Sequence, residues 1–227
     1  MGYTEKEIIE MCEKEMRNPS AFYKAEVINY RGRTTDTDKL YNEIVAKFVC
    51  GHLTEFVGGM KKITREETYK TVSHTGESMP SDSREEEQIA VKLFRQKHFD
   101  CIGSIIDYQT PLKNTAKDVA GKIDLLSYDG ETLYILELKK PDSAETMLRC
   151  VLEGYTYMKT ADTEKLLSNF DLPADTKVVA CPFVFLNGDQ HNETKENRPN
   201  LKNIMHLLNS KPYYIIKENN KYRVVEA

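Results

Sequence analysis

The chain has 227 residues, of which 40% are hydrophobic and 30% are charged, and its formal net charge is −4. This composition is typical of an ordinary soluble globular protein, and no apolar run approaches the length of a membrane span. The N-terminus also lacks the basic-then-apolar layout of a signal peptide, so we expect a cytoplasmic protein with no membrane partner.

The acidic balance argues against the uniformly basic surface that tight nonspecific nucleic-acid binders carry. Any contact with nucleic acid would therefore depend on a local basic patch, and a solvated charged surface is the alternative. Five lysines fall close to the hairpin described below and would form such a patch: Lys113, Lys117, Lys122, Lys139 and Lys140.

The five cysteines are an odd number and are widely scattered along the chain. They form no CxxC pair, so the sequence carries no zinc or redox signature. We expect reduced, mostly buried thiols.

The first 80 residues are predicted to form a mainly helical extension. Thr4–Met16 has apolar residues at helical spacing, and Thr4 with Glu7 has the layout of a capping box. A second amphipathic helix is expected over Thr37–Val57. The polar segment Lys61–Ser83 is expected to be a loop or linker, which places a domain boundary near residue 80.

Residues 81–227 are predicted to form the core domain. Ser83–Gln96 has the pattern of a helix, with Ser83 as its N-cap and Glu86 at the capping-box position. Asp100–Gln109 is predicted to be the first core strand, with Gly103 at a bulge or a crowded approach.

Two apolar runs, Lys122–Tyr128 and Thr132–Lys139, flank Asp129-Gly130, a dipeptide typical of hairpin turns. Counting back from a two-residue turn pairs Asp124 with Ile135. Directly opposed residues share a face, and so do residues two apart along a strand. The two strands are apolar on both faces, which is typical of inner strands.

This register puts Asp124, Glu137 and Lys139 on one side of the hairpin. The two acids are then diagonal neighbours, with Cβ atoms somewhat under roughly 7–8 Å apart, close enough to share a cation. Burying a charge without a partner is costly, so a divalent cation between the carboxylates would explain their placement. The alternative is a short ion-pair cluster at the frayed end of an edge hairpin.

After the hairpin, a helix is predicted over Asp142–Lys159. Beside its apolar stripe, polar residues recur every four positions, which places them on one seam. The seam consists of Glu145, Arg149, Glu153 and Tyr157. A strand is predicted over Lys177–Leu186, and Pro182 within it indicates an edge strand or the end of the strand. The remaining predicted elements are a polar loop over Asn187–Pro199, a helix over Asn200–Leu208, and a closing hairpin of Tyr213–Lys217 with Lys221–Val225. The order of elements predicts an α/β fold, a mixed sheet with helices on both faces.

The hairpin around Asp129-Gly130 resembles the motif of the PD-(D/E)XK nuclease superfamily, which has an acid in one strand, a tight turn and then acid-x-lysine in the next strand. Asp124 matches its first acid, Glu137 its second acid and Lys139 its lysine. The surrounding GKIDLL and LYILELK are similar to restriction-endonuclease-like and Holliday-junction-resolvase-like members. Ile123 stands where the motif name has proline, a residue that many members of the superfamily replace. The match covers about residues 85–157, and it implies a restriction-endonuclease-like αβββαβ core.

The resemblance also implies a metal site and further site residues. Asp124, Glu137 and the Leu138 carbonyl would hold one or two Mg²⁺ (or Mn²⁺) ions. The superfamily's helical glutamate would be Glu87 by its ExxA motif, although helical geometry favours Glu86. For either, the alternative is an acid favoured in a first helical turn by the helix dipole. Arg149 would face the site after the lysine motif, with Tyr157 as the second candidate for this role, and the usual glutamine there has no clear counterpart. The alternative for Arg149 is a pair of i,i+4 salt bridges with its flanking glutamates.

The function that these matches imply is metal-dependent hydrolysis of phosphodiester bonds in nucleic acid. DNA is the expected substrate, and RNA is the alternative. Lys139 would orient or help deprotonate the attacking water. Superfamily members are often dimers, so the resemblance also suggests a homodimer. The alternatives are a catalytically inactive nuclease-fold module for nucleic-acid binding or protein assembly, and a purely structural ion-pair cluster.

Overall fold

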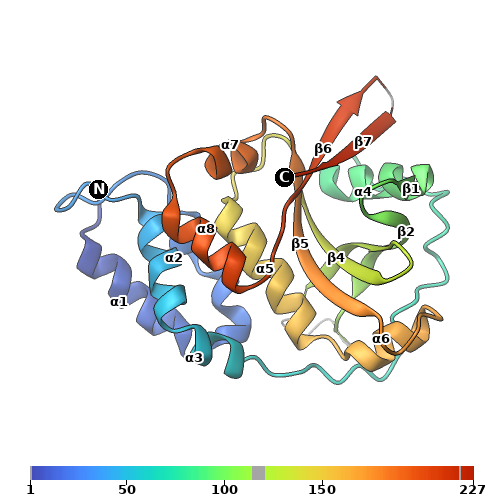
Figure 1. The fold of residues 1–227 in the computed structure, drawn as a ribbon, viewed down its shortest axis with the longest axis horizontal. Helices are drawn as coiled ribbons and strands as arrows, with labels where there is room; N and C mark the ends of the chain where they lie inside the picture. Colours follow the sequence, from blue (N-terminus) through green and yellow to red (C-terminus); the bar gives the residue numbers. More distant parts are fainter. Residues whose placement is uncertain (1, 114–120, 220) are drawn as a thin grey trace.

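The computed structural model describes residues 2–113, 121–219 and 221–227 (Figure 1). Its architecture is α/β, with a seven-stranded sheet whose strand order follows the chain from β1 to β7. The strands are β1 (His98–Phe99), β2 (Gly103–Pro111), β3 (Lys122–Tyr128), β4 (Thr132–Lys139), β5 (Lys177–Phe185), β6 (Tyr213–Glu218) and β7 (Lys221–Glu226).

The sheet is mixed, as the sequence predicts. Neighbours from β1 to β4 are antiparallel, β5 is parallel to both β4 and β6, and β6 and β7 form the closing antiparallel hairpin. Parallel neighbours need a long crossover connection, usually helical, and both crossovers here contain helices. The helices are α1 (Glu5–Met16), α2 (Tyr41–Gly51), α3 (Leu53–Gly58), α4 (Glu85–Gln96), α5 (Met147–Thr160), α6 (Thr163–Asn169), α7 (Asp189–Lys195) and α8 (Pro199–Leu207), with 3₁₀ turns η1 (Pro19–Lys24) and η2 (Glu26–Asn29).

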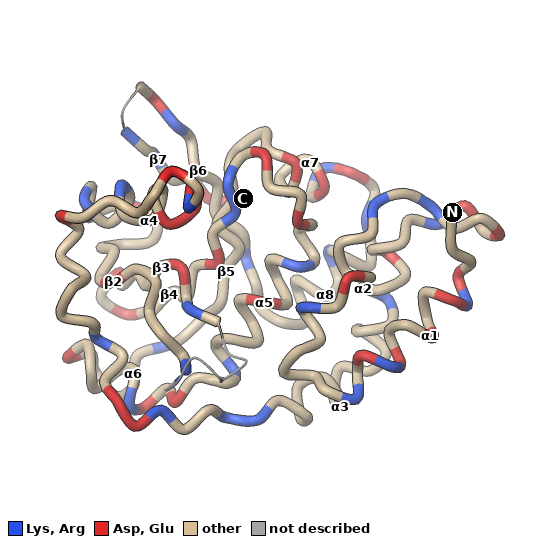
Figure 2. Tube along the Cα trace, turned by 180° about the vertical axis from the view of Figure 1, so that it is seen from behind, with Lys and Arg blue, Asp and Glu red and all other residues tan. Residues whose placement is uncertain are grey.

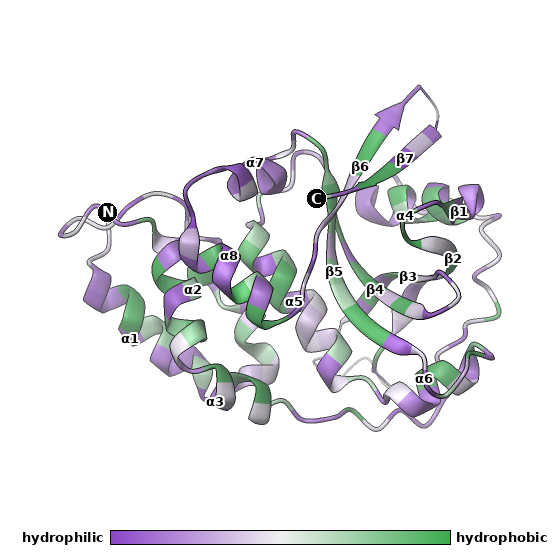
Figure 3. Ribbon diagram, in the orientation of Figure 1, coloured by the Kyte–Doolittle hydropathy of each residue, from purple (hydrophilic) through white to green (hydrophobic). Residues whose placement is uncertain are grey.

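Helices cover the two faces of the sheet unequally. On one face, Leu126 and Ile135 belong to a buried cluster that also contains apolar residues of α5, α8 and the N-terminal helices. On the other face, Leu125 and Leu136 pack with α4. The inner strand β5 is accordingly mainly hydrophobic along its length (Figure 3). The helices α1, α2, α8 and α5 lie on one side of the sheet and α4 lies on the other (Figure 1).

The first 80 residues are packed against α5. Ile8 of α1 and Val45 of α2 are fully buried in the same cluster as the hairpin and α5. The predicted linker is also held in place, because Tyr69 is fully buried and the Ile63 N–H donates to the Thr160 carbonyl at 2.7 Å. None of the helices in the described ranges has the length and apolar character needed to cross a membrane.

Several predicted helix boundaries are wrong. The predicted helix Thr37–Val57 is two helices, because it breaks at His52. α4 begins at Glu85, and no side chain caps it, so the predicted Ser83 cap is absent. α5 begins five residues later than predicted, where the Thr146 hydroxyl accepts the Arg149 N–H at 3.2 Å. The predicted loop after β5 contains α7. The capping box that begins α1 is confirmed.

The hairpin β3–β4 forms as predicted, but its turn lies one residue later. Gly130 and Glu131 are the central residues, since the Asp129 N–H donates to the Thr132 carbonyl at 3.3 Å. The Asp129 carboxylate accepts the N–H groups of Glu131 and Thr132, at 2.9 and 2.7 Å, and stabilises this turn. The predicted register is therefore wrong by two residues, with Leu126 opposite Ile135. Because side chains alternate with a period of two, a shift of two leaves every side chain on its predicted face.

The predicted close approach at Gly103 is confirmed. Gly103 has a φ of +72°, and a Cβ placed on it would collide with the backbone of Tyr128 and Asp129. A bulge follows in β2 between Ile105 and Asp107. These features set the position of β2 beside the hairpin.

Candidate active site

Asp124 lies where β3 and β4 stop pairing. The hydrogen-bonded ladder ends at Leu125 opposite Leu136. Beyond that point, Asp124 Oδ2 accepts the Leu138 N–H at 2.9 Å, and Oδ1 accepts Gln109 Nε2 of β2 at 3.0 Å. The N–H and C=O of a strand residue point toward the same neighbouring strand, so the Leu138 carbonyl also faces β3. The Asp124 carboxylate and the Leu138 carbonyl are therefore brought to the same gap between the strands.

Glu137 and Lys139 are neighbours on the same face of β4. Lys139 Nζ donates to Glu137 Oε1 at 2.7 Å, and both side chains are almost fully buried. The second oxygen, Glu137 Oε2, is buried and accepts from no donor among the described residues, although the Glu137 carboxyl lies within hydrogen-bond reach of the Glu153 carboxyl. α5 approaches closely here, because a Cβ on Gly154 would lie 3.2 Å from Glu137 Cβ.

α5 adds a third buried acid to the site. Glu153 Oε2 lies 3.2 Å from Lys139 Nζ, and its Oε1 accepts the Tyr157 hydroxyl at 2.8 Å. Tyr23 from the N-terminal part of the chain donates to the Tyr157 hydroxyl at 3.4 Å. The sequence places Glu153 and Tyr157 on the polar seam of this helix, but it gives no reason to assign Glu153 to the site.

Glu145 and Arg149 border this cluster. Glu145 Oε2 lies 2.7 Å from Lys139 Nζ. Arg149 Nε lies 3.3 Å from Glu145 Oε1 and 3.5 Å from Glu153 Oε2, and its guanidinium lies over the Tyr23 ring. Arg149 therefore faces the site, and it also makes the ion pairs with both flanking glutamates that were the alternative expectation.

Of the two helical glutamates, Glu86 is the one that reaches the hairpin. Glu86 Oε1 accepts the Lys140 N–H at 3.0 Å, just after the lysine of the motif. Glu87 instead pairs with Arg84, at 3.2 Å, near the start of its own helix. The geometry of the helix, rather than the ExxA match, selects the acid that faces β4.

Acids outnumber bases in this cluster. Among the described residues, Glu137, Glu145 and Glu153 form ion pairs with Lys139 or Arg149, and Asp124 lies near Lys139. Counted over these six side chains, the four acids and two bases leave an excess of two negative charges when all are ionised. Without a further cation, protons must neutralise part of this excess.

The titration behaviour of the cluster follows from this imbalance. Burial raises the pKa of Asp124 to about 7. Burial, together with repulsion from Glu153, raises the pKa of Glu137 well above its ordinary value. Burial alone would lower the pKa of Lys139, but Glu137 and Glu153 outweigh it and raise that pKa well above its usual range. Lys139 is therefore an ammonium group at neutral pH.

A pocket of about 610 Å³ opens beside this cluster, between the start of α4 and the segment that leads into α5. Glu145 and Glu86 line it, so the pocket connects the ion pairs of Lys139 with the surface. The start of α4 is acidic (Figure 2). The pocket is lined by Asp82, Ser83, Arg84, Glu85, Glu86, Glu87, Lys140, Ser143, Ala144 and Glu145.

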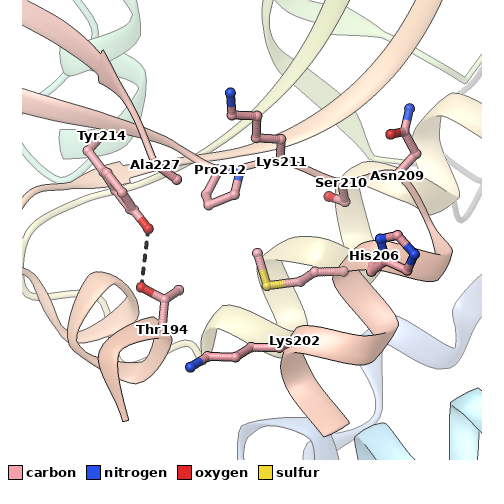
Figure 4. Close-up of a pocket in the computed structure, with 10 residues that line it drawn as sticks. Thr194, Lys202, His206, Asn209, Ser210, Lys211, Pro212, Tyr214 and Ala227 are labelled. Atoms are coloured by element: carbon pink, nitrogen blue, oxygen red, sulfur yellow. Dashed lines mark hydrogen bonds between the residues drawn. The ribbon is translucent and has the colours of Figure 1, made fainter. Parts of the chain in front are cut away.

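A second pocket, of about 410 Å³, has a different chemistry (Figure 4). It lies between α7, α8 and the start of β6, and Lys202, His206 and Lys211 border it. The Tyr214 and Thr194 hydroxyls face each other across one side at 3.1 Å. Within the described part of the chain, no aspartate or glutamate side chain lines this pocket, so it offers no comparable acid site.

The predicted basic patch is smaller than the sequence suggests. Lys139 is buried in the cluster, and Lys140 Nζ lies 3.1 Å from both Glu85 and Asp142. Lys113 is partly exposed and Lys122 is exposed. Lys117 falls outside the described residues.

The donor set suits a hard divalent cation that needs few protein ligands. No three His, Cys, Asp or Glu side chains in the described ranges are grouped as ligands of one metal ion. Mg²⁺ is commonly held by only one or two carboxylates, with waters and substrate phosphates completing its shell. Asp124, Glu137 and the Leu138 carbonyl provide oxygen atoms of this kind. The unpartnered Glu137 Oε2 and the excess negative charge fit such an ion.

No protein-family model, no curated protein and no solved structure matches this chain.

Proposed function

We propose that this chain is a metal-dependent nuclease that hydrolyses phosphodiester bonds of DNA or RNA. The observation that carries the proposal is the convergence of Asp124, Glu137 and Lys139 at one end of a hairpin, in a buried cluster with excess negative charge. The order α4, β2, β3, β4, α5 and β5, with the two-residue β1 and the short α6 inserted, supports a restriction-endonuclease-like αβββαβ core around this site.

In this proposal Asp124, Glu137 and the Leu138 carbonyl hold Mg²⁺ or Mn²⁺. When bound, such an ion polarises a phosphoryl oxygen and lowers the pKa of a water molecule. Gln109 and the Leu138 N–H fix the orientation of the Asp124 carboxylate, at 3.0 and 2.9 Å. This prior orientation is what a site needs if charge is to be stabilised without rearrangement.

Lys139 supplies positive charge and does not remove a proton. Its raised pKa keeps the side chain protonated, so its role is to donate hydrogen bonds to oxygens that gain negative charge. Glu153 holds the ammonium from the side of α5, and Tyr157 fixes Glu153 in turn. Glu86 positions the main chain just after Lys139 through the Lys140 N–H.

The test is a cleavage assay with Mn²⁺ on single-stranded, duplex and branched DNA and on RNA. We expect cleavage by the wild type, and a loss of at least about 100-fold in Asp124→Asn and Lys139→Met, in line with the removal of a single electrostatic catalytic group. Asp175→Asn, at an exposed position away from the site, is the matched control and should cleave normally. Equal turnover by Asp124→Asn and the wild type, both folded by circular dichroism, would refute the assignment.

The second candidate is an inactive module that binds nucleic acid or a protein, and one observation favours its protein-binding form. The pocket beside the site is lined by five acids and two basic residues, a balance that repels a polyanion. Such a module would bind its partner equally well with and without Mn²⁺ and would cleave no nucleic acid. A purely structural ion-pair cluster would bind neither metal nor nucleic acid.

A further inference from the structure

Three carboxylates surround the ammonium group of Lys139. Nζ donates to Glu137 Oε1 at 2.7 Å and to Glu153 Oε2 at 3.2 Å, and Glu145 Oε2 forms an ion pair with it at 2.7 Å. The Glu145 oxygen therefore stands where a substrate oxygen would contact Lys139 from the side of the pocket. A substrate oxygen can take that position only if the Glu145 carboxylate leaves it.

Glu145 is the carboxylate that can be replaced. The side chain of Glu145 is 31% exposed, whereas those of Glu137 and Glu153 are 4% and 10% exposed. Glu137 lies within β4 and Glu153 within α5, where Tyr157 also holds it. Glu145 precedes the N-cap of α5 and lines the 610 Å³ pocket, so its carboxylate can swing toward solvent.

The same carboxylate also faces Arg149. Glu145 Oε1 lies 3.3 Å from Arg149 Nε while Oε2 faces Lys139, so the two oxygens bridge two cations. Arg149 Nε is nevertheless buried without a well-formed hydrogen bond in the described part of the chain. The Nε–H of Arg149 can therefore donate to an anion whose oxygen gives a better hydrogen-bond geometry.

We propose that the Glu145 carboxylate occupies the position of the substrate's phosphate in the free protein, and that a phosphodiester displaces it to bind Lys139 and Arg149. A phosphodiester matches the carboxylate, since each carries one negative charge and offers two equivalent oxygens. The exchange therefore leaves the charge of the cluster unchanged. This inference rests on the proposed function, because it names how that site admits its substrate.

The test measures binding apart from cleavage. Fluorescence anisotropy with labelled 12-nucleotide DNA and RNA strands of the same sequence, in EDTA, compares the wild type with Glu145→Gln and Glu145→Ala. Both variants should bind at least one strand more tightly, by roughly threefold to thirtyfold, the range expected when two ion pairs no longer compete. Asp82→Asn removes one negative charge from the same pocket and should change binding by less than about twofold.

Two further variants separate displacement from a general loss of negative charge. In a Lys139→Met or Arg149→Met background, Glu145→Gln should increase the affinity for the strand much less, because one of the two cations that would bind the phosphate is missing. A gain retained in both backgrounds, a gain equal to that of Asp82→Asn, or no binding by any variant would overturn the inference. Tighter binding by Glu145→Gln without cleavage in Mn²⁺ would uphold the phosphate position and reject the nuclease, whereas cleavage with unchanged binding would reject the Glu145 role alone.

Discussion

The charged residues of the cluster depend on one another because most of them are buried and are neutralised mainly by each other. Lys139 is the central residue, since it contacts three of the four carboxylates. Breaking a buried ion pair by removing one partner is costly, because the remaining charges lose their compensation. The electrostatics of the site can therefore be tested through folding stability as well as through catalysis.

Lys139→Met should destabilise the protein, and more at pH 8 than at pH 5. Burial would raise the pKa of Glu153, but Lys139 and Arg149 keep it below its ordinary value. Without Lys139, Glu153 must either stay ionised with Arg149 as its remaining cation or take up a proton, which costs more as pH rises. We expect a loss on the order of 3–5 kcal/mol at pH 8 in urea unfolding. Lys6→Met, an exposed control, should change stability by less than about 0.5 kcal/mol at either pH; equal behaviour of the two variants would contradict this description.

Asp124→Asn should make the stability of the metal-free protein less dependent on pH. Burial raises the pKa of Asp124 to about 7, against about 3.9 for aspartate in an unfolded chain. The folded state therefore binds this proton more tightly, and stability declines as pH rises from about 4 to about 7 and then levels. Because the side chain is only partly buried, we expect a decline on the order of 1–3 kcal/mol.

Urea titrations between pH 4 and pH 8 measure this decline. It should be smaller in Asp124→Asn, whose amide does not titrate, and unchanged in Asp175→Asn. The same pH dependence in the wild type and Asp124→Asn would show that this carboxyl is not the one whose pKa is raised.

At the scale of elements, the hairpin β3–β4 determines the site. The sequence predicts both strands and the face that carries Asp124, Glu137 and Lys139, because side chains alternate between the two faces with a period of two. The exact turn could not be predicted, since Asp129 uses its side chain to cap the turn instead of forming its centre. The prediction of the face is still correct, because the register is shifted by an even number of residues.

The helical contributions to the site were harder to predict. Helical periodicity favours Glu86, whereas the family motif favours Glu87, and only the structure places Glu86 against the Lys140 N–H. Glu153 could not be assigned, because a seam of polar residues every four positions looks the same on a solvated helix face. Pro182 lies inside β5, where the sequence predicts an edge or an end. β6 joins β5 only from Phe183 onward, so the strand has an open side at that proline.

Gly130→Ala should destabilise the protein by about 1–2 kcal/mol, because an alanine rarely adopts a left-handed conformation. Gly130 has a φ of +107°, and open space surrounds the position of an added Cβ, so the cost would be purely conformational. Gly51→Ala is the matched control, since an added Cβ there also meets open space, but in α2. Alanine in a helix should stabilise by up to about 1 kcal/mol. Chemical denaturation of both variants checks the pair, and equal effects at both positions would contradict the assigned turn.

At the scale of the molecule, the N-terminal part of the chain completes the site. Phe56 of α3 stacks on Tyr155 of α5, and Tyr23 contacts both Arg149 and Tyr157. The sequence places a boundary near residue 80 because the segment Lys61–Ser83 is polar. It could not reveal that the helices before this segment share one buried cluster with α5 and α8.

A chain of residues 81–227 should therefore not fold on its own. Its α5 would expose the apolar face that η1 covers, and its α8 would expose the face that α2 covers. Large exposed apolar surfaces lead to aggregation. A ¹H–¹⁵N NMR spectrum of this fragment should lack the dispersion of the full chain. A well-dispersed spectrum with preserved urea stability would mean that the first 80 residues are a separate extension.

The proposed cation is the feature on which the whole account depends, and calorimetric titration with Mn²⁺ tests it most directly. The wild type should release or absorb heat as it binds Mn²⁺ at a saturable site. The affinity of this binding should increase from pH 6 to pH 8, because the acids must lose their protons to hold the ion. Asp124→Asn should lose that heat, and Asp175→Asn should keep it. Identical titrations of the wild type and Asp124→Asn, or no saturable heat of Mn²⁺ binding in the wild type at pH 8, would contradict the claim that these carboxylates hold a divalent cation.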